Sequence, residues 1–258
     1  MTKLTILMPS WQEPEVLKVS IPYLLKSYTV ETQTIVILNE GDKESVQFLS
    51  QFPEVEFIKL NKNYGPLAVD WALPMITGEY VANVNADMIF PPGWQDEVLE
   101  IAAAYYPCTS SCHLVETFQS NNPVVSVDDL GNWFSLEAAE NFLTNYKNNK
   151  YLLPKLVSYT HPIITLTEDF QKVGGYSNFD LNWFPGWGLD DWYPFKLKNL
   201  NPKYNFITAG NSCVFHASSL TSRKLPAHLR KDNADYFKQL TGKTIQQFRQ
   251  EIGIFNLV

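Results

Sequence analysis

Short apolar runs alternate with helix-like stretches over the first hundred residues, and this alternation restricts the fold more than any other feature. The runs are rich in β-branched residues and continuous, which is typical of strands buried on both faces of a parallel sheet. Strand–helix–strand units at this spacing predict right-handed crossovers. The predicted strands are Leu4–Met8 (ended by Pro9), Thr34–Leu38, Val55–Leu60 and Tyr80–Val84, and the predicted helices are Val16–Tyr28, Lys43–Phe52 and Leu67–Met75.

Polar or turn-forming residues follow each of these predicted strands. In open α/β sheets, ligands bind beyond the carboxyl ends of the strands. Four polar loops at one edge of the sheet therefore predict a binding site. The loops are residues 9–13 (PSWQE), 39–42 (NEGD), 61–65 (NKNYG) and 85–87 (NAD).

The second half of the chain has a different pattern. Residues 107–135 are rich in Ser, Thr, Asn and Pro, which is typical of loops. Thr167 and the two acids after it indicate a capped helix start, and Gly174-Gly175 indicates the end of that helix. Further strands are predicted at His113–Phe118, Ile163–Leu166, Asn205–Thr208 and Cys213–His216, and further helices at Leu136–Tyr146, 190–200, Asn233–Leu240 and Thr244–Ile252.

Composition narrows the class of protein. A chain of 258 residues fits one α/β domain, and a net charge of −7 disfavours a general nucleic-acid surface, because such surfaces are basic. The basic cluster Arg223–Lys231 is either a solvated face or a local phosphate contact. No run approaches the length of a transmembrane segment, and the N-terminal apolar run is too short for a signal peptide. Three cysteines predict reduced thiols. We therefore expect a cytoplasmic protein.

The triplet Asn85-Ala86-Asp87 follows the fourth predicted strand. A carboxylate there is suited to a hard cation, since Mg²⁺ and Mn²⁺ prefer oxygen ligands and bridge carboxylates to substrate phosphates. Asn and Asp are also common turn residues. The triplet alone leaves both interpretations open.

Four segments in a fixed order carry a family resemblance. They are LTILMPSWQE, TIVILNEGDKES, NKNYGPLAVDWALPMITGEYVANVNADMIFPPGW and FQKVGGYSNFDLNWFPGWGLDDWYPFKL. Together they resemble the nucleotide-sugar glycosyltransferases of the GT-A fold, closest to the family 2 type, and GWGLDD also resembles the GWG-x-[ED]-D block of the β-1,4-galactosyltransferase group. The resemblance covers residues 4–216.

This resemblance implies a Rossmann-like α/β fold, with a mixed, mainly parallel central sheet flanked by helices and a C-terminal acceptor-side region. It divides a single domain, residues 1–258, into a nucleotide-sugar-binding half (1–106), an acceptor and catalytic half (107–216) and a helical tail (217–258).

The resemblance also implies contacts to the nucleotide-sugar donor. Asn85 takes the position of the first acid in the family's Asp-x-Asp motif and is expected to contact the metal weakly or the donor's ribose or sugar. Relatives often carry an Arg-Asn pair where this chain has Asp70-Trp71, which leaves the diphosphate-side arginine and the nucleotide open. The other implied donor contacts are Pro9, Ser10 and Glu13 in the first loop, Glu40 and Asp42 in the nucleobase loop, and Asn63 and Gly65 before the next helix.

Asp87 and His216 are the implied ligands of Mn²⁺ or Mg²⁺. Asp87 matches the last acid of the Asp-x-Asp motif, and His216 matches the histidine that completes the metal site in many relatives. Imidazole is a good ligand for Mn²⁺. Without the resemblance, a histidine after Val-Phe is more often structural.

The paired aspartates carry the implied chemistry. In the resembled families the second acid is the general base, which makes Asp191 the base and leaves Asp190 to hold the acceptor or orient the loop. A sugar hydroxyl is a poor acid and needs such a base. Both aspartates also fit an N-terminal cap of the helix that follows. Trp187 is a candidate for stacking on a sugar, and Gly186 and Gly188 allow a tight turn beside the substrate.

We therefore expect a metal-dependent, inverting hexosyltransferase that uses a nucleotide-diphosphate sugar, with a UDP-sugar as the preferred donor. The acceptor is open between a glycan, a protein, a small molecule and a modified nucleic-acid base. An alternative is a degenerate GT-A module that binds a sugar nucleotide or glycan without catalysis. A nucleotidyltransferase is disfavoured, because MPSWQEPE is not the Gly-rich, basic loop with which such enzymes begin.

Overall fold

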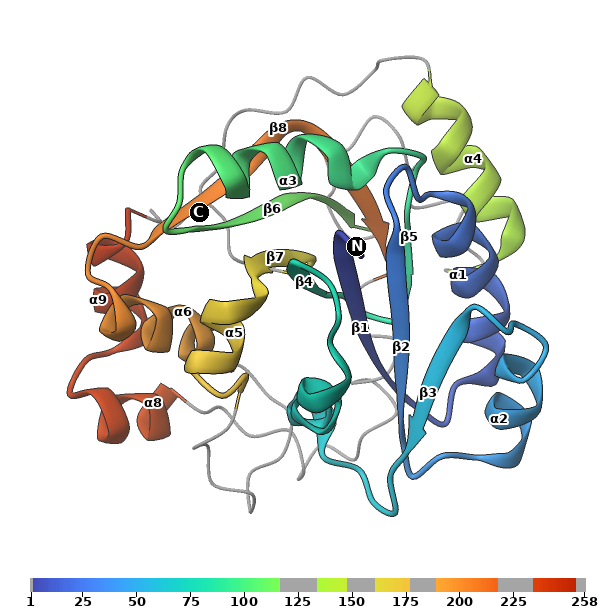
Figure 1. Ribbon diagram of the computed structural model, residues 1–258, viewed down its shortest axis with the longest axis horizontal. Helices are drawn as coiled ribbons and strands as arrows, with labels where there is room; N and C mark the ends of the chain where they lie inside the picture. Colours follow the sequence, from blue (N-terminus) through green and yellow to red (C-terminus); the bar gives the residue numbers. More distant parts are fainter. Residues whose placement is uncertain (1, 117–133, 148–160, 177–188, 218–233, 254–258) are drawn as a thin grey trace.

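The structure of the protein is a computed structural model that describes residues 2–116, 134–147, 161–176, 189–217 and 234–253 (Figure 1). Its described strands form one eight-stranded sheet in the order β3-β2-β1-β4-β7-β6-β8-β5. The strands are β1 (Leu4–Trp11), β2 (Thr32–Asn39), β3 (Val55–Lys59), β4 (Tyr80–Asn83), β5 (Met88–Ile89), β6 (Cys108–Glu116), β7 (Ile163–Leu166) and β8 (Asn205–His216). The helices are α1 (Pro14–Lys26), α2 (Lys43–Leu49), η1 (Gly65–Met75), α3 (Trp94–Ala104), α4 (Leu136–Lys147), α5 (Thr167–Lys172), α6 (Leu189–Leu200), α8 (Ala234–Thr241) and α9 (Ile245–Glu251).

The sheet is mixed and mainly parallel. Parallel pairs join β3 to β2, β2 to β1, β1 to β4 and β6 to β8. Antiparallel pairs join β4 to β7, β7 to β6 and β8 to β5. The predicted GT-A-like fold class is confirmed. Since β7 runs backwards, its first residue, Ile163, lies opposite Asn83, the last residue of β4.

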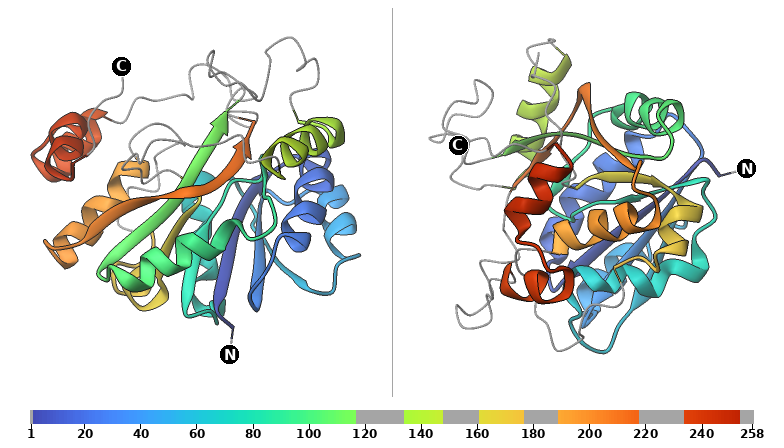
Figure 2. Two further views of the ribbon diagram at one scale, coloured as in Figure 1. Left: turned by 90° about the horizontal axis from the view of Figure 1, so that it is seen from above. Right: turned by 90° about the vertical axis from the view of Figure 1, so that its left-hand side faces the viewer.

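Alternate residues of the central strands face two separate apolar layers, as the period of two in a strand requires. Ile6 and Met8 of β1 face the layer that holds α1 and α3, whereas Leu7 faces the layer that holds η1, α5 and α6. Figure 2 shows helices on both sides of the sheet. Burial on both faces explains why these strands are continuous apolar runs.

Proline at position 9 does not end the first strand, contrary to the prediction. In a parallel pair the N–H and C=O of one residue face the same neighbouring strand. Val84 N donates to Leu7 O, so the backbone N–H and C=O groups of the odd-numbered residues of β1 point toward β4. The pairing with β4 stops at Leu7 and Asn83, and Pro9, which has no N–H, lies beyond that point. β1 therefore continues along β2 to Trp11.

Other predicted elements also need correction. The segment predicted as a helix over Leu67–Met75 is the 3-10 helix η1, which contains Pro74, a residue without an N–H to donate. The Thr167 hydroxyl does not cap α5; it donates to Gly78 O at 2.7 Å. Helix α3 and the short strand β5 were not predicted. Gly174 and Gly175 end α5 with φ of 68° and 57°, as predicted.

The two strands predicted near the end of the chain are one strand, β8. Its middle contains Gly210 and Asn211, residue types that are common in turns, and the register with β6 shifts between Ser111 and His113. The carboxylate of Glu97 on α3 accepts hydrogen bonds from Gly210 N (3.2 Å) and Asn211 N (2.8 Å). This carboxylate satisfies backbone donors at the irregularity, so the strand continues through it.

Cys108, Cys112 and Cys213 are buried free thiols. No helix in the described parts of the chain is long and apolar enough to span a bilayer.

We predict that Glu97→Ala lowers the free energy of unfolding by about 2 kcal/mol, because it removes charge-assisted hydrogen bonds from two backbone donors. Glu100→Ala on the exposed side of the same helix is the matched control and is expected to cost less than about 0.5 kcal/mol. Urea denaturation of both variants measures the difference. Equal losses would show that Glu97 does not support the irregularity in β8.

Candidate active site

The chain reversals bring the carboxyl ends of β4, β6 and β8 to the same edge of the sheet as the start of β7. His216, the last residue of β8, pairs with Met88 of β5, which directly follows Asp87. Ala217 N donates to Asp87 O at 3.0 Å. The Asn85–Asp87 loop and the end of β8 therefore meet, although they are separated by about half of the chain.

The predicted metal ligands lie side by side. His216 Nε2 is 3.3 Å from Asp87 Oδ1 and 3.3 Å from the side-chain nitrogen of Asn85. The side chains of His216 and Asp87 are 13% and 8% exposed. Two ligands in neighbouring positions of an octahedron with bonds of 2.0–2.1 Å lie roughly 3 Å apart. The carboxylate oxygen and the imidazole nitrogen are therefore spaced to share one cation.

Larger clusters of metal-binding side chains do not occur within the described residues: none has three or more His, Cys, Asp or Glu in position to hold an ion. Mg²⁺ and similar ions usually keep several waters and bind through one or two protein ligands together with substrate phosphates. The pair Asp87 and His216 fits a site of that type.

Asp190, in the first turn of α6, reaches the same edge of the sheet. Its side chain is 50% exposed, and its Oδ1 lies 3.5 Å from His161 Nε2. His161 precedes β7 and is itself only 13% exposed. Its Nδ1 lies 3.1 Å from Asn83 O, and its Nε2 lies 3.4 Å from the Tyr176 hydroxyl. His161 was not predicted, and no local motif marks it.

The pKa of Asp190 is below its ordinary value. Burial raises the pKa, but the hydrogen bond and charge of His161, followed by the charges of Arg249 and His216, lower it further. The carboxyl group of Asp190 is therefore ionised at neutral pH.

Asp191 is placed differently. It is fully buried, and Arg249 of α9 forms a bidentate pair with it: Nε is 2.9 Å from Oδ1, and Nη2 is 3.0 Å from Oδ2. Asp191 is therefore buried and already paired with a cation, whereas Asp190 is half-exposed. The assignment of the base to Asp191 stays a prediction, and this difference in environment bears on it.

Aromatic packing supports the same ion pair. Phe195 of α6 contacts Phe237 of α8 and Phe248 of α9, with ring centroids 5.7 Å apart in each case. The rings of Phe237 and Phe248 are 5.8 Å apart. The C-terminal helices are thus docked on α6 by an apolar cluster as well as by a charge pair.

Glu40 and the first loop form a second group of contacts at the carboxyl ends of β1 and β2. Glu40 Oε2 accepts hydrogen bonds from Trp11 Nε1 (2.8 Å) and Gln12 Nε2 (3.4 Å). Gln12 and Glu40 both have positive φ, 50° and 46°, which is uncommon for residues other than glycine. Such backbone strain is concentrated at functional sites.

The other predicted residues of the first loop point inward. Ser10 and Glu13 are each 3% exposed, and the Ser10 hydroxyl donates to Glu13 Oε1 at 3.3 Å. Pro9 lies within β1. The buried Ser10–Glu13 hydrogen bond stabilises the first loop. A direct contact of Ser10 or Glu13 with a nucleotide stays a prediction.

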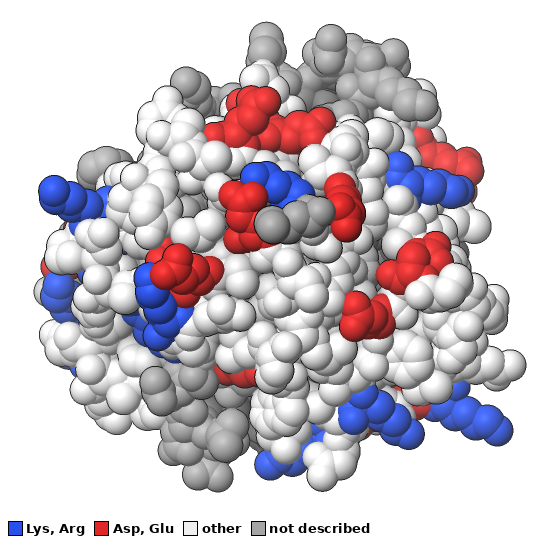
Figure 3. All heavy atoms as spheres, viewed as in Figure 1, with Lys and Arg blue, Asp and Glu red and all other residues white. Residues whose placement is uncertain are grey.

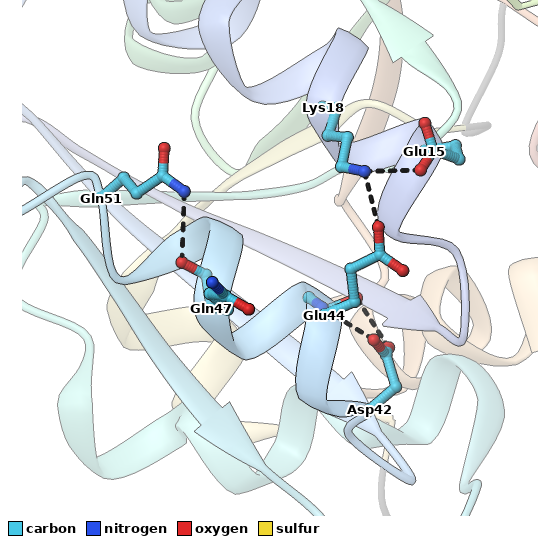
Figure 4. Close-up of polar contacts among 7 residues, drawn as sticks. Glu15, Lys18, Asp42, Glu44, Gln47 and Gln51 are labelled. Carbon is cyan, nitrogen blue, oxygen red and sulfur yellow. Dashed lines mark hydrogen bonds and ion pairs between the residues drawn. The ribbon is translucent and has the colours of Figure 1, made fainter.

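Asp42 caps α2 (Figure 4). Its Oδ1 accepts from Ser45 N and its Oδ2 from the Ser45 hydroxyl, both at 2.7 Å. Burial raises the pKa of Asp42, but the hydrogen bonds from Ser45 lower it further, and the net pKa is below the ordinary value. Asp42 therefore has a structural task, and its contact with a nucleobase stays a prediction.

The turn before η1 is held by asparagine side chains. Asn63 Oδ1 accepts from Gly65 N at 2.7 Å, and Gly65 has a φ of 58°. Asn39, the last residue of β2, accepts from Tyr64 N at 2.9 Å and donates to Gly65 O at 3.3 Å. These bonds join the second and third loops of the site.

Asp70 holds the turn after α5. Its Oδ1 accepts from Tyr176 N at 2.8 Å, and burial raises its pKa to about 7. Lys196 donates to Gly175 O at 2.9 Å, and burial lowers its pKa to about 8. A side chain at Gly175, whose φ is positive, would clash with Asp70 Oδ1.

Several predicted residues lie outside the described parts of the chain. They are Trp187, Gly186 and Gly188, together with the basic cluster Arg223–Lys231. On the face drawn in Figure 3, the described Lys and Arg side chains are scattered among Asp and Glu side chains.

Comparison with known families assigns the chain. The model of glycosyl transferase family 2 matches residues 5–167, which is more than half of the chain. The chain belongs to this family. Membership implies a nucleotide-sugar donor and an acceptor. The match ends before α6, so the galactosyltransferase-type block stays a prediction.

Two solved structures have a similar fold. The crystal structure of S. aureus TarS 1-349 matches with a TM-score of 0.59 and 11% identity, over 84% of this chain and 61% of that one. The crystal structure of S. aureus TarS matches with a TM-score of 0.55 and 13% identity, over 84% of this chain and 37% of that one. At these identities the likeness shows the fold alone, and this chain spans less than two thirds of the length of either. A comparison with curated proteins finds no match.

We predict unequal costs for breaking the buried ion pair. Arg249→Met removes the cation from a fully buried carboxylate and is expected to lower the free energy of unfolding by about 3–5 kcal/mol. Asp191→Asn is expected to cost less, because the Arg249 side chain is 29% exposed and reaches water. Denaturant unfolding of the two variants compares them. A smaller loss for Arg249→Met than for Asp191→Asn would contradict the burial of Asp191.

Proposed function

We propose that this protein is an inverting glycosyltransferase that transfers a sugar from a nucleotide-diphosphate donor to an acceptor hydroxyl, with Asp190 as the general base. The observation that carries the proposal is the environment of Asp190. Its carboxylate is half-exposed, has a lowered pKa and lies at the edge of the sheet where Asp87 and His216 also meet.

Asp190 has the properties that the reaction needs from a base. A sugar hydroxyl loses its proton reluctantly, so a positioned carboxylate must accept that proton while the oxygen attacks. The acceptor O–H bond breaks as the bond from oxygen to the anomeric carbon forms. The bond from that carbon to the diphosphate oxygen breaks on the opposite face, which inverts the configuration. Asp191, paired with Arg249, holds the turn of the helix that carries Asp190.

Asp87 and His216 are the residues that would hold Mn²⁺ or Mg²⁺, with Asn85 beside them. A bound cation of this kind neutralises the charge that develops on a leaving diphosphate. We propose a UDP-sugar as the donor. Glu40, next to Trp11, is the more suitable contact for the nucleobase, since both carboxylate oxygens of Asp42 bond to Ser45. The acceptor is a glycan, a protein, a small molecule or a modified base.

One second candidate has specific support. Asn85 replaces an acid, and Asp70-Trp71 replaces an Arg-Asn pair, as in a module that binds a sugar nucleotide without transferring the sugar. Such a module would release no nucleoside diphosphate from any donor. Slow, metal-dependent release by the wild-type protein would favour the enzyme.

We predict that Asp190→Asn lowers transfer by about 10²–10⁴-fold, the usual contribution of a general base. Donor affinity is expected to change little, because Asn has the same shape. Asp235→Asn, an exposed aspartate on α8, is the matched control and should keep the wild-type rate. Release of nucleoside diphosphate measures turnover, and calorimetry measures donor binding. Turnover of Asp190→Asn at the parental rate would refute the assignment.

We also predict that one donor stabilises the protein in a metal-dependent way. A thermal-shift screen of UDP-, GDP-, CDP- and dTDP-sugars, with and without Mn²⁺, should single out a UDP-sugar, because specific ligands raise stability by mass action. The Mn²⁺-dependent part of the shift should disappear in Asp87→Ala. An equal shift in EDTA would contradict the metal site.

A further inference from the structure

His161 is held by a backbone carbonyl in a way that fixes its proton. Nδ1 lies 3.1 Å from Asn83 O. A carbonyl oxygen only accepts hydrogen bonds, so Nδ1 must carry hydrogen in every charge state of the ring that keeps this bond. The remaining nitrogen, Nε2, is then bare in the neutral ring and protonated in the imidazolium.

Two groups face Nε2, and each suits a different state of the ring. The Tyr176 hydroxyl lies at 3.4 Å, and burial raises the pKa of Tyr176 well above its ordinary value. Tyr176 therefore keeps its proton and can donate it to a bare Nε2. Asp190 Oδ1 lies at 3.5 Å and only accepts when ionised. A proton on Nε2 therefore turns the ring from a partner of Tyr176 into a partner of Asp190.

The other charged groups around Asp190 come from separate elements. Arg249 approaches from α9, and His216 approaches from β8. Arg249 forms its bidentate pair with Asp191, and His216 lies 3.3 Å from Asp87 Oδ1 and from the Asn85 side-chain nitrogen. His161 Nε2 lies 3.5 Å from Asp190 Oδ1, and its hydrogen bond and charge are the largest influences that lower the pKa of Asp190.

We propose that His161 is the positioning residue of Asp190: its protonated ring, fixed by the Asn83 carbonyl, holds the Asp190 carboxylate ionised and in one orientation. The contact is independent of what Asp190 does, but its value for catalysis rests on the proposed function, in which Asp190 is the base.

The contact between His161 and Asp190 should affect how activity depends on pH. A base must be ionised, so activity is lost as the pH falls through the pKa of Asp190. Contact with His161 lowers that pKa, and removal of the ring leaves burial, which raises the pKa, opposed only by the charges of Arg249 and His216. The acid limb of the rate profile should therefore move to higher pH when His161 is replaced.

The first experiment measures the pKa of the Asp190 carboxyl group with and without His161. In protein labelled with ¹³C at the aspartate carboxyls, with Asp190→Asn used to assign the resonance, the pKa of Asp190 should rise in His161→Gln. His113→Gln, the same change at another buried histidine, should leave that pKa unchanged. An equal pKa in wild type and His161→Gln would overturn the proposal.

A second measurement needs no variant at position 161, so it stands if His161→Gln fails to fold. As the pH is lowered, the ¹⁵N shift of His161 Nε2 and the ¹³C shift of the Asp190 carboxyl should change together, because the protonated Nε2 becomes a donor to Asp190. An Asp190 carboxyl resonance that does not respond when His161 gains its proton would overturn the proposal.

Turnover measurements distinguish the role of His161 as a positioning residue from the role of Asp190 as the general base. If Asp190→Asn keeps its activity, the proposed base is wrong, whereas the NMR results still decide the contact. If Asp190→Asn is inactive and the acid limb of kcat/KM in His161→Gln moves upward with the pKa of Asp190, His161 positions the base. A wild-type acid limb in active His161→Gln would refute that role while leaving Asp190 as the base.

Discussion

The bidentate ion pair between Arg249 and Asp191 is the interaction on which the proposed catalytic half depends. Asp191 is completely buried, and a buried carboxylate needs a paired cation. The cation comes from α9, beyond the residues that match the family model. The docked tail thereby fixes the first turn of α6, and the neighbouring aspartate, Asp190, stays half-exposed beside His161. Two adjacent carboxylates thus acquire different environments: Asp191 is fully buried, and Asp190 is half-exposed at the edge of the sheet.

The reversal of strand direction at β7 has a similar effect on the rest of the site. Because β7 is antiparallel to β4, the residues that precede it lie next to the residues that end β4, which places His161 against Asn83 O. The long strand β8 returns to the same edge and brings His216 to Asp87. The first half of the sheet is parallel and the second half is mixed. This arrangement brings side chains that are far apart in the sequence, such as Asp87, His161 and His216, to the same edge of the sheet.

Much of this arrangement could be predicted from the sequence, and the failures have physical causes. Continuous apolar runs and the polar loops after them located β1 to β4 and the loop that carries Asp87, because burial and turn chemistry are local properties. Pro9 misled the prediction, since the effect of a missing N–H depends on which neighbour it faces. The prediction of Asp191 as the base did not include its ion pair with Arg249, because Arg249 lies 58 positions away in the sequence. The apolar spacing of Trp94, Val98, Leu99 and Ala102 is a helical signal that would have found α3.

The central claim is that Asp190 performs chemistry while Asp191 performs a structural task. Chemical rescue tests it most directly, by adding formate to Asp190→Gly and to Asp191→Gly while following release of nucleoside diphosphate. A small carboxylate can enter the space left at the half-exposed Asp190 and accept the acceptor's proton there, whereas the Asp191 site is closed to solvent. The account predicts that formate restores turnover to Asp190→Gly alone. Rescue of Asp191→Gly, with none for Asp190→Gly, would contradict it.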